Sequence, residues 1–266
     1  MRLPADNEAY APEFPPGLQW VGVAFLRMAQ QIGRPILVEF FDSARVNSQR
    51  TLPYMRAWHD RYGERGLLRV IGVHSPAYSF GRDPAAAVPA IEQMDIPYAV
   101  VLDPDFAVWR EYGNRGWPAR YVFDRRGVLR FVHWGEGEYE ETERVIQELI
   151  AETDPEGEIE LPELLEPLRP EDAPDAQMEP QTADIALPAD LERIELTGEW
   201  TPGDDYVEAQ REGASASVPR FRAGAAYAVL SGSVAAAGLQ ATDGTVVAEA
   251  PGLRLHGFQF TPLPPQ

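Results

Sequence analysis

The side chains of this chain that could take part in bond chemistry are few, and none is a thiol. The 266 residues include no cysteine, which excludes disulfides, thiolate metal ligands and thiol nucleophiles. The nucleophile and base that remain closest in the predicted fold are Ser48 and His74. A serine nucleophile needs a base within hydrogen-bond reach, and neither a nucleophile-elbow motif nor an acid partner accompanies this pair in the sequence. We therefore keep a non-redox enzyme using Ser48 and His74 as an alternative hypothesis.

The remaining histidines and the acid clusters do not form a recognisable metal site. The four histidines are His59, His74, His133 and His256, and no two have metal-ligand spacing. The carboxylates of residues 135–143 (GEGEYEETE) are typical of the acid-rich first turn of a helix, where the helix dipole favours them. We expect no metal and no cofactor.

Composition indicates a globular, strongly acidic protein. Hydrophobic residues make up 44% of the sequence, which is enough to fill well-packed cores. The formal net charge is −19, and so acidic a surface repels phosphate backbones and anionic lipids. No run reaches the ~20 apolar residues of a membrane-spanning helix. We therefore expect no nucleic-acid partner and no membrane insertion.

The first 17 residues, MRLPADNEAYAPEFPPG, bear on the compartment. They carry acids and prolines where a secretory signal has a basic and then an apolar segment. We expect a cytoplasmic protein, with the periplasm as the alternative if an export signal has been removed.

Strands alternate with helices between residues 18 and 152. Continuous apolar runs predict buried strands at 35–41, 67–74 and 98–103, and 119–124 and 128–134 predict a hairpin around Arg125-Arg126-Gly127. Helical spacing predicts helices at 17–33, 47–62, 83–94, 106–112 and 139–152, and Pro53 should kink the second. This order is typical of an α/β layered domain with a mixed sheet.

The composition and patterning of the sequence change twice after this domain. Residues 153–190 are rich in prolines and acids and predict an extended acidic linker. Apolar residues of this linker could still dock on a domain surface, namely Ile159, Leu161, Leu164, Leu165 and Leu168. Residues 191–266 consist of short alternating runs, which predict a small all-β sandwich or jelly roll of seven or eight strands. Asp243-Gly244 is the strongest hairpin signal there. The predicted organisation is an arm (1–17), an α/β domain (18–152), a linker (153–190) and a sandwich (191–266).

Specific motifs give the α/β domain a family resemblance. The run FFDSARVNSQRTLPY ends in RTLPY (residues 50–54), GVHSPAYSF follows at 72–80, and Pro118 lies in YGNRGWPARYVFDRRG. In these motifs the domain resembles the thioredoxin-like superfamily, in particular the redoxin module of DipZ-type cytochrome c biogenesis proteins. That family has Cys-Ile-Asn-Cys where this chain has Arg45, Val46, Asn47 and Ser48.

The resemblance implies three further features. It implies a thioredoxin-like fold, a cis-proline at Pro118 facing the active-site helix, and a C-terminal sandwich similar to carbohydrate-binding modules. LTGEWTPGDDYVEA (residues 196–209) and HGFQFTP (residues 256–262) are similar to parts of that extension. Ala77 stands where the family has an acid.

The two substitutions change what the helix N-terminus can do. A positive charge at Arg45 lies at the positive end of the helix dipole and costs roughly 0.3–1 kcal/mol unless offset. Asp42 or Glu39 could pair with it, or a bound anion could do so. The Ser48 hydroxyl is expected to cap the helix. Trp117, before Pro118, could stack on a bound peptide or pack in the core.

Together these residues favour a redox-inactive, cysteine-free thioredoxin-like protein that binds a protein or peptide or serves as a scaffold. No thiol–disulfide oxidoreductase or peroxidase activity is expected. The expected binding residues are Arg45, Asn47, Ser48, His74, Trp117 and Pro118, because backbone groups beside a cis-proline can pair with an extended peptide. The alternatives are the Ser48/His74 enzyme and a glycan-binding module in the sandwich. The partner's identity and a homo-oligomeric state stay open.

Overall fold

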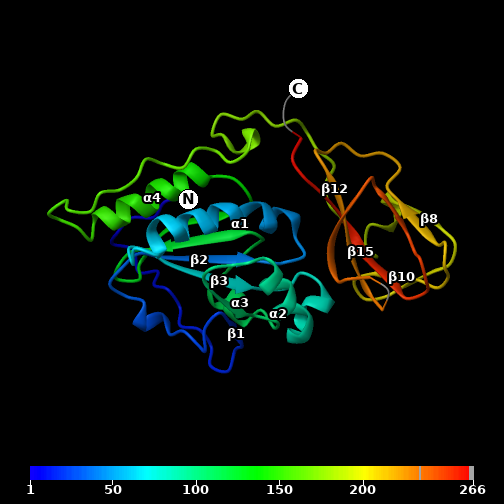
Figure 1. Ribbon diagram of the computed structural model, residues 1–266, viewed down its shortest axis with the longest axis horizontal. Helices are drawn as coiled ribbons and strands as arrows, with labels where there is room; N and C mark the ends of the chain where they lie inside the picture. The colour runs from blue at the N-terminus through cyan, green and yellow to red at the C-terminus, as the bar shows by residue number, and fades with distance from the viewer. Residues whose placement is uncertain (234, 264–266) are drawn as a thin grey trace. The chain divides into compact units, whose positions relative to one another are not determined.

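The computed structural model describes residues 1–233 and 235–263, and the chain folds into two compact units. Figure 1 traces the chain through both. The first unit comprises Met1–Ser43, Asn47–Pro76 and Ala87–Pro174. The second begins at Asp175 and also includes two short segments, Ala44–Val46 and Ala77–Ala86.

The first unit is built on a six-stranded mixed sheet in the order β1-β4-β3-β2-β5-β6. β2 pairs in parallel with β3, and β3 with β4, whereas the other pairs are antiparallel. The strands are β1 (Trp20–Val21), β2 (Ile36–Phe41), β3 (Arg69–His74), β4 (Ala99–Leu102), β5 (Ala119–Phe123) and β6 (Leu129–Trp134). β5 and β6 form the hairpin predicted around Arg125-Arg126-Gly127. The α/β fold predicted from the sequence is confirmed.

Helices cover both faces of this sheet (Figure 1). They are α1 (Val46–Trp58), α2 (Pro84–Gln93), α3 (Ala107–Glu111) and α4 (Tyr139–Ala151), and a π-helical turn, His59–Gly63, continues α1. Buried residues of α1, α2 and α4 share one core with alternate residues of β2, including Leu37 and Phe41. The side chains between them, such as Ile36 and Val38, pack in a second core with Val108 of α3. Because successive side chains of a strand point to opposite faces, the fully buried strand β2 contributes side chains to both cores.

The helix predicted over 17–33 is wrong. The structure has the short strand β1 and a 3₁₀ turn, Met28–Gln30, in that region. Gly22 adopts a positive φ of 84° that interrupts any helix, and the backbone of Trp20 pairs instead with Val101 of β4. Edge pairing to an existing sheet overrides the helical spacing of the apolar residues.

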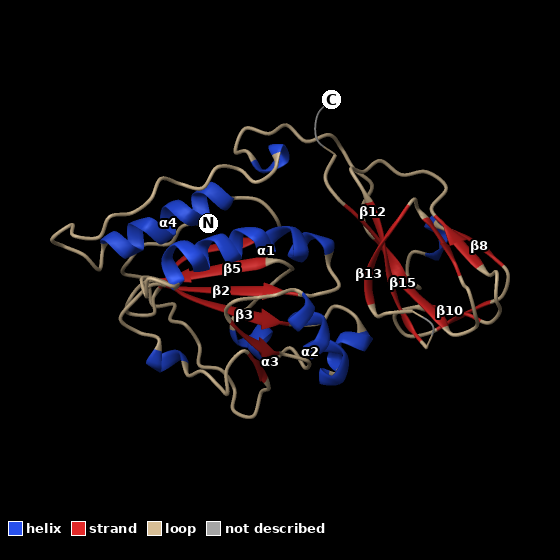
Figure 2. Cartoon of the chain, in the orientation of Figure 1, coloured by secondary structure: helices blue, strands red, loops and turns tan. Residues whose placement is uncertain are grey.

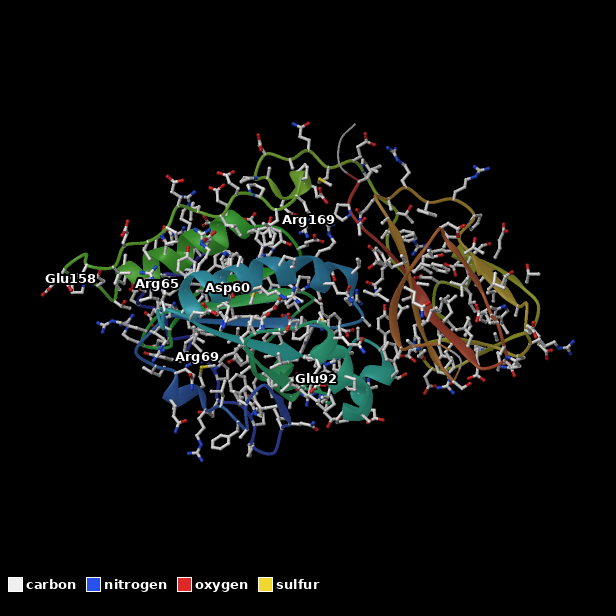
Figure 3. The ribbon with its side chains drawn as sticks, in the orientation of Figure 1. Asp60, Arg65, Arg69, Glu92, Glu158 and Arg169 are labelled. Atoms are coloured by element: carbon white, nitrogen blue, oxygen red, sulfur yellow. The ribbon has the colours of Figure 1, made fainter. Side chains whose placement is uncertain are left out.

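Residues 159–172, here called the strap, lie within the first unit. Ile159, Leu161 and Leu165 pack on the core that α1 and α4 share. The strap's backbone is also anchored, because the Leu168 amide donates to the Tyr54 hydroxyl at 2.7 Å. Arg169, labelled in Figure 3, donates through its guanidinium to the carbonyl of Arg50. Proline-rich sequence here forms an extended but docked segment.

The second unit contains two antiparallel sheets (Figure 2). One has the order β13-β12-β15-β10-β9, with β7 also paired to β15, and the other has the order β14-β11-β8. The strands are β7 (Ile185–Ala186), β8 (Glu195–Thr197), β9 (Trp200–Pro202), β10 (Val207–Ala209), β11 (Ser215–Ser217), β12 (Ala226–Gly232), β13 (Gly238–Thr242), β14 (Thr245–Val247) and β15 (Leu253–Phe260). Buried residues of both sheets form a single core. The predicted all-β architecture is confirmed.

Asp243-Gly244 does not join a hairpin. It links β13, which pairs with β12, to β14, which pairs with β11 in the other sheet. Gly244 has the positive φ that the turn requires, and the Thr242 hydroxyl accepts from the amides of Gly244 and Thr245. The local turn signal is real, but side-chain burial decides to which sheet each flanking strand belongs.

The docking of the strap depends on one buried carboxylate, and we expect its removal to release the strap. Glu143 of α4 is 1% exposed and accepts from the Tyr62 hydroxyl at 2.5 Å and from the Leu165 amide at 2.8 Å. Glu143→Ala leaves both donors buried without an acceptor, which costs about 1–3 kcal/mol. Limited proteolysis should then cut the strap faster, and urea unfolding should show the loss of stability.

Glu140→Ala is the matched control on the same helix, because its exposed ion pair with Arg144 contributes little to stability. Equal protease resistance of the strap in the Glu143 and Glu140 variants would show that the buried carboxylate does not hold it.

Candidate functional site

Strand register brings the end of β2, where the chain turns towards α1, next to the residue that follows the cis-proline. Phe41 at the end of β2 lies opposite His74 at the end of β3, because the two strands are parallel. On the other side of β2, Phe40 pairs with Ala119, the residue after Pro118. The Trp117–Pro118 peptide is cis. α1 begins at Val46, so the chain leaves β2 and enters the helix at this edge of the sheet.

Ser48 is buried and does not cap the helix. Its side chain is 1% exposed, and its hydroxyl accepts from the backbone amide of Asp42 at 3.3 Å. The expected role as an N-cap is therefore wrong. The hydroxyl fixes the loop that leaves β2, while the Asn47 side chain accepts from the Ser48 amide at 2.9 Å.

Asn47 and Trp117 connect the helix to the cis-proline loop. Asn47 Nδ2 donates to the carbonyl of Trp117 at 2.9 Å, and Trp117 Nε1 donates to the carbonyl of Ser75 at 2.7 Å. The indole also packs on Trp109, with ring centroids 4.4 Å apart. α1, the loop and the end of β3 are thus joined by side-chain-to-backbone bonds that involve no thiol.

The serine beside His74 is Ser43, not Ser48. His74 is 1% exposed, and its Nε2 lies 3.2 Å from the Ser43 hydroxyl and 3.5 Å from Asp42 Oδ1. Ser43 and Asp42 face the same ring nitrogen, whereas a serine–histidine–acid triad places the acid on the other nitrogen. This cluster therefore does not have the geometry of an acyl-transfer site, and the Ser48–His74 pairing is corrected.

Arg45 and Glu39 have partners that the sequence did not indicate. Arg45 belongs to the second unit, where its guanidinium lies 3.8 Å from Asp184. Glu39 faces the core shared by α1 and α4, accepts from the Tyr98 hydroxyl at 3.2 Å and lies opposite Arg120 across the β2–β5 pair. One charged residue in each of two otherwise apolar strands is the sequence signal that could have revealed this buried pair.

Burial dominates the titration of Glu39. Burial raises the pKa of its carboxyl to about 8, although Arg120 and the Tyr98 hydroxyl act in the opposite direction. A carboxyl that keeps its proton near neutral pH carries no full charge into the core, which lowers the desolvation cost.

A second buried acid, Asp103, organises the neighbouring strand end and was missed in the sequence. It accepts from the Ser75 hydroxyl at 2.9 Å and from the backbone amides of Val108 and Trp109 at the start of α3. An aspartate three residues before the short apolar run at 106–109 was the available signal. Asp103 thereby positions Trp109 against Trp117.

Stability should depend on pH through Glu39. The folded state keeps the Glu39 proton up to about pH 8, whereas the unfolded chain releases it near the ordinary value of 4.5. The stability contributed by this group is therefore fully present below pH 4.5 and is lost as the pH rises towards 8. We expect Glu39→Gln to flatten the fall in unfolding free energy between about pH 5 and pH 8, measured by urea titration.

The exposed Glu111→Gln serves as the control and should keep the wild-type slope. If the Glu39 variant loses stability over this range as steeply as the wild type does, another group titrates instead.

Within the described residues, no helix is both long and apolar enough to cross a membrane. No protein-family model matches the chain. It is similar to the protein DipZ of Mycobacterium tuberculosis, with 34% identity over 150 residues that make up 56% of this chain and 21% of DipZ. It is also similar to the thiol-disulfide oxidoreductase YkuV of Bacillus subtilis, with 29% identity over 126 residues, or 47% of this chain and 84% of YkuV. The chain thus matches about a fifth of the length of DipZ.

Solved structures give similar coverage. A thioredoxin-like protein in its oxidised form is 27% identical, with 55% of this chain and 97% of that chain covered and a TM-score of 0.49. A thiol-disulfide isomerase from Corynebacterium glutamicum is 22% identical, with 53% and 97% covered and a TM-score of 0.48. The two relatives and the mixed sheet point to the same fold, and the absence of cysteine shows that the chain lacks a dithiol. The first unit has a thioredoxin-like fold and resembles the redoxin module of DipZ-type proteins, and the chain contains no cysteine.

Proposed function

We propose that this chain is a redox-inactive thioredoxin-like protein that binds a protein or peptide segment beside the cis-proline loop. The observation that carries the proposal is a set of hydrogen bonds, here called the frame, that joins the start of α1 to the cis-proline loop and to the end of β3 without any thiol. Asn47 still ties α1 to Trp117, and Trp117 is tied to Ser75. With no cysteine, this frame cannot serve dithiol chemistry of the chain's own, so binding is the remaining use that it supports.

The surface near the loop has the composition of a protein-binding site. Phe106, Trp109, Trp117 and Trp134 are all partly exposed, and the Arg115 guanidinium stacks over the Trp134 ring at 5.0 Å from its centroid. Tryptophan and arginine are enriched among the residues that dominate binding energy at interfaces. An extended peptide next to a cis-proline adds backbone hydrogen bonds to such aromatic contacts.

Arg45 gives the proposed partner a chemical preference. A guanidinium at a helix N-terminus binds carboxylates well, and Asp184 lies 3.8 Å from it. That distance and the partial exposure of both side chains make the pair weak. A partner carboxylate could replace Asp184, which favours a peptide with an acidic side chain or a free C-terminus.

The proposal is tested by selecting a random peptide library on the full chain and measuring the affinity of the selected peptide by calorimetry. We expect Trp117→Ala and Arg45→Glu each to weaken binding at least about tenfold, because each removes a contact of the size of an interface anchor. Trp117→Phe keeps an aromatic ring without the Nε1 donor and should lose less.

Trp200→Ala changes an aromatic residue of the second unit and should leave the affinity unchanged. Peptides that bind the Trp117→Ala and Arg45→Glu variants as tightly as the wild type would place recognition elsewhere and overturn the proposal.

Restoring the two thiols should restore redox chemistry if the frame is intact. Arg45→Cys together with Ser48→Cys places one thiol before α1 and the other at the buried Ser48 position, where a helix N-terminus lowers a thiol pKa. We expect insulin reduction at least about tenfold faster than by the unchanged chain. A double variant that is folded but no more active than the wild type would show that the frame does not position a dithiol.

Localisation stays a prediction of the sequence, with the cytoplasm as the expectation and the periplasm as the alternative; fractionation of the native host distinguishes them. Glycan binding by the second unit also stays a prediction. The enzyme alternative in the first unit no longer has its Ser48–His74 pair, since the hydroxyl of Ser48 contacts the Asp42 amide.

A further inference from the structure

Three polar side chains meet on adjacent strands of the second unit. Ser231 lies on β12 and His256 on β15, and these two strands are paired. Asp205 lies in the turn between β9 and β10, and β10 is the other neighbour of β15. These residues are far apart in the sequence, so only the sheet order brings them together.

Their atoms have the connectivity of a serine–histidine–acid triad. The Ser231 hydroxyl lies 2.8 Å from His256 Nε2, and Asp205 Oδ1 lies 3.5 Å from His256 Nδ1. Serine and acid thus face opposite ring nitrogens, as the triad mechanism requires and as the His74 cluster does not. The 3.5 Å separation is longer than a formed hydrogen bond, a looseness that is common in catalytic groups before substrate binds.

A backbone irregularity orients the histidine. Val229 pairs with Gly257 and Leu230 with Leu255, so His256 is the extra residue of a bulge in β15. Bulges redirect a side chain and recur next to active sites. The imidazole is 1% exposed, and among the described residues its Nδ1 forms no hydrogen bond of good geometry, although Asp205 Oδ1 lies 3.5 Å away. A buried Nδ1 that faces a carboxylate without forming a hydrogen bond of good geometry is unusual for a purely structural histidine.

The acid is held in its charged form. Burial alone would raise the pKa of Asp205, but His256 and hydrogen bonds from Ser79 lower it to about 2. The turn that presents Asp205 is closed by the Gly203 amide, which donates to the Tyr206 carbonyl. A Cβ at residue 203 would collide with the Tyr206 ring, so glycine is required for this packing.

Aromatic rings surround the imidazole. Phe80, Tyr78 and Tyr206 have ring centroids 4.9, 5.5 and 5.5 Å from that of His256. Phe80 and Tyr78 belong to the segment Ala77–Ala86, which is part of the second unit. These rings shield the imidazole from water, so its polar contacts are made in an apolar environment.

We propose that Ser231, His256 and Asp205 form an acyl-transfer site for small carboxylic esters. Ser231 Oγ attacks the ester carbonyl carbon while its proton passes to His256 Nε2, and Asp205 stabilises the resulting imidazolium. Collapse of the tetrahedral adduct breaks the bond to the alkoxy oxygen, which takes the proton from Nε2 and leaves as the alcohol. Water then attacks the acyl-serine, loses a proton through Nε2 to Ser231 Oγ, and releases the carboxylic acid.

The rings around His256 define the substrate class further. The rings of Phe80, Tyr78 and Tyr206 offer apolar contact, which favours an uncharged acyl group. Ser231 is 4% exposed, which favours a small acyl group over a bulky one. This inference concerns the second unit and does not depend on the function proposed for the first.

A fluorophosphonate probe tests the site in the full chain, because Ser231 Oγ would displace fluoride and form a stable phosphonate ester. We expect the adduct on Ser231 by peptide mass spectrometry, and its loss in Ser231→Ala. His256→Gln should slow labelling at least about a hundredfold, the size of a general-base contribution. Asp205→Asn should slow it at least about tenfold, and circular dichroism checks that each variant is folded.

Ser217→Ala, on β11 of the same unit, is the matched control and should be labelled at the wild-type rate. Phe80→Ala thins the aromatic wall and should raise the labelling rate of Ser231. The proposal is overturned if neither the wild type nor Phe80→Ala forms a Ser231 adduct under conditions that fully label chymotrypsin. It is also overturned if folded His256→Gln and Asp205→Asn chains are labelled as fast as the wild type.

Discussion

The fully buried central strand β2 determines most of what the first unit can do. Its six residues are all buried, it pairs with β3 on one side and with β5 on the other, and its alternate side chains enter two different cores. A shift of one residue would exchange the two sets of side chains and place Glu39 in the wrong layer. This register also decides which residues meet at the end of the strand.

The site at that end of β2 has hydrogen bonds that position its loop, but it has no thiol. In a thioredoxin the helix N-terminus favours a thiolate through its dipole and free amides. Here the same position follows an arginine, and the serine of the first turn is used to hold the Asp42 amide. The bonds from Asn47 to Trp117 and from Trp117 to Ser75 remain, because they depend on amide and indole donors rather than on sulfur. The hydrogen bonds that hold the helix start and the cis-proline loop together therefore do not require a thiol.

Three carboxylates have different roles, which their surroundings decide: Glu39 and Glu143 are buried, and Asp205 is partly exposed. Glu39 is held protonated because burial raises its pKa, Glu143 accepts from donors on the π-helical extension of α1 and on the strap, and Asp205 stays charged beside a histidine that lowers its pKa. Glu39 and Glu143 accept from buried tyrosine hydroxyls that would otherwise cost stability.

Local pattern in the sequence determined the alternation of strands and helices, the hairpin between β5 and β6, and the absence of thiol chemistry. The thioredoxin-like resemblance rested on contiguous motifs such as RTLPY. Those features depend on residues near one another in the chain, where periodicity and turn chemistry act directly. The pairing of Trp20 with β4 and the switch of sheets at Asp243-Gly244 depended on tertiary structure, because long-range backbone pairing overrides local propensity.

Tertiary structure likewise decided that Ser43 rather than Ser48 lies beside His74, and that Ser231, His256 and Asp205 meet. Contacts between side chains on different strands depend on sheet order and register, and no local pattern encodes those.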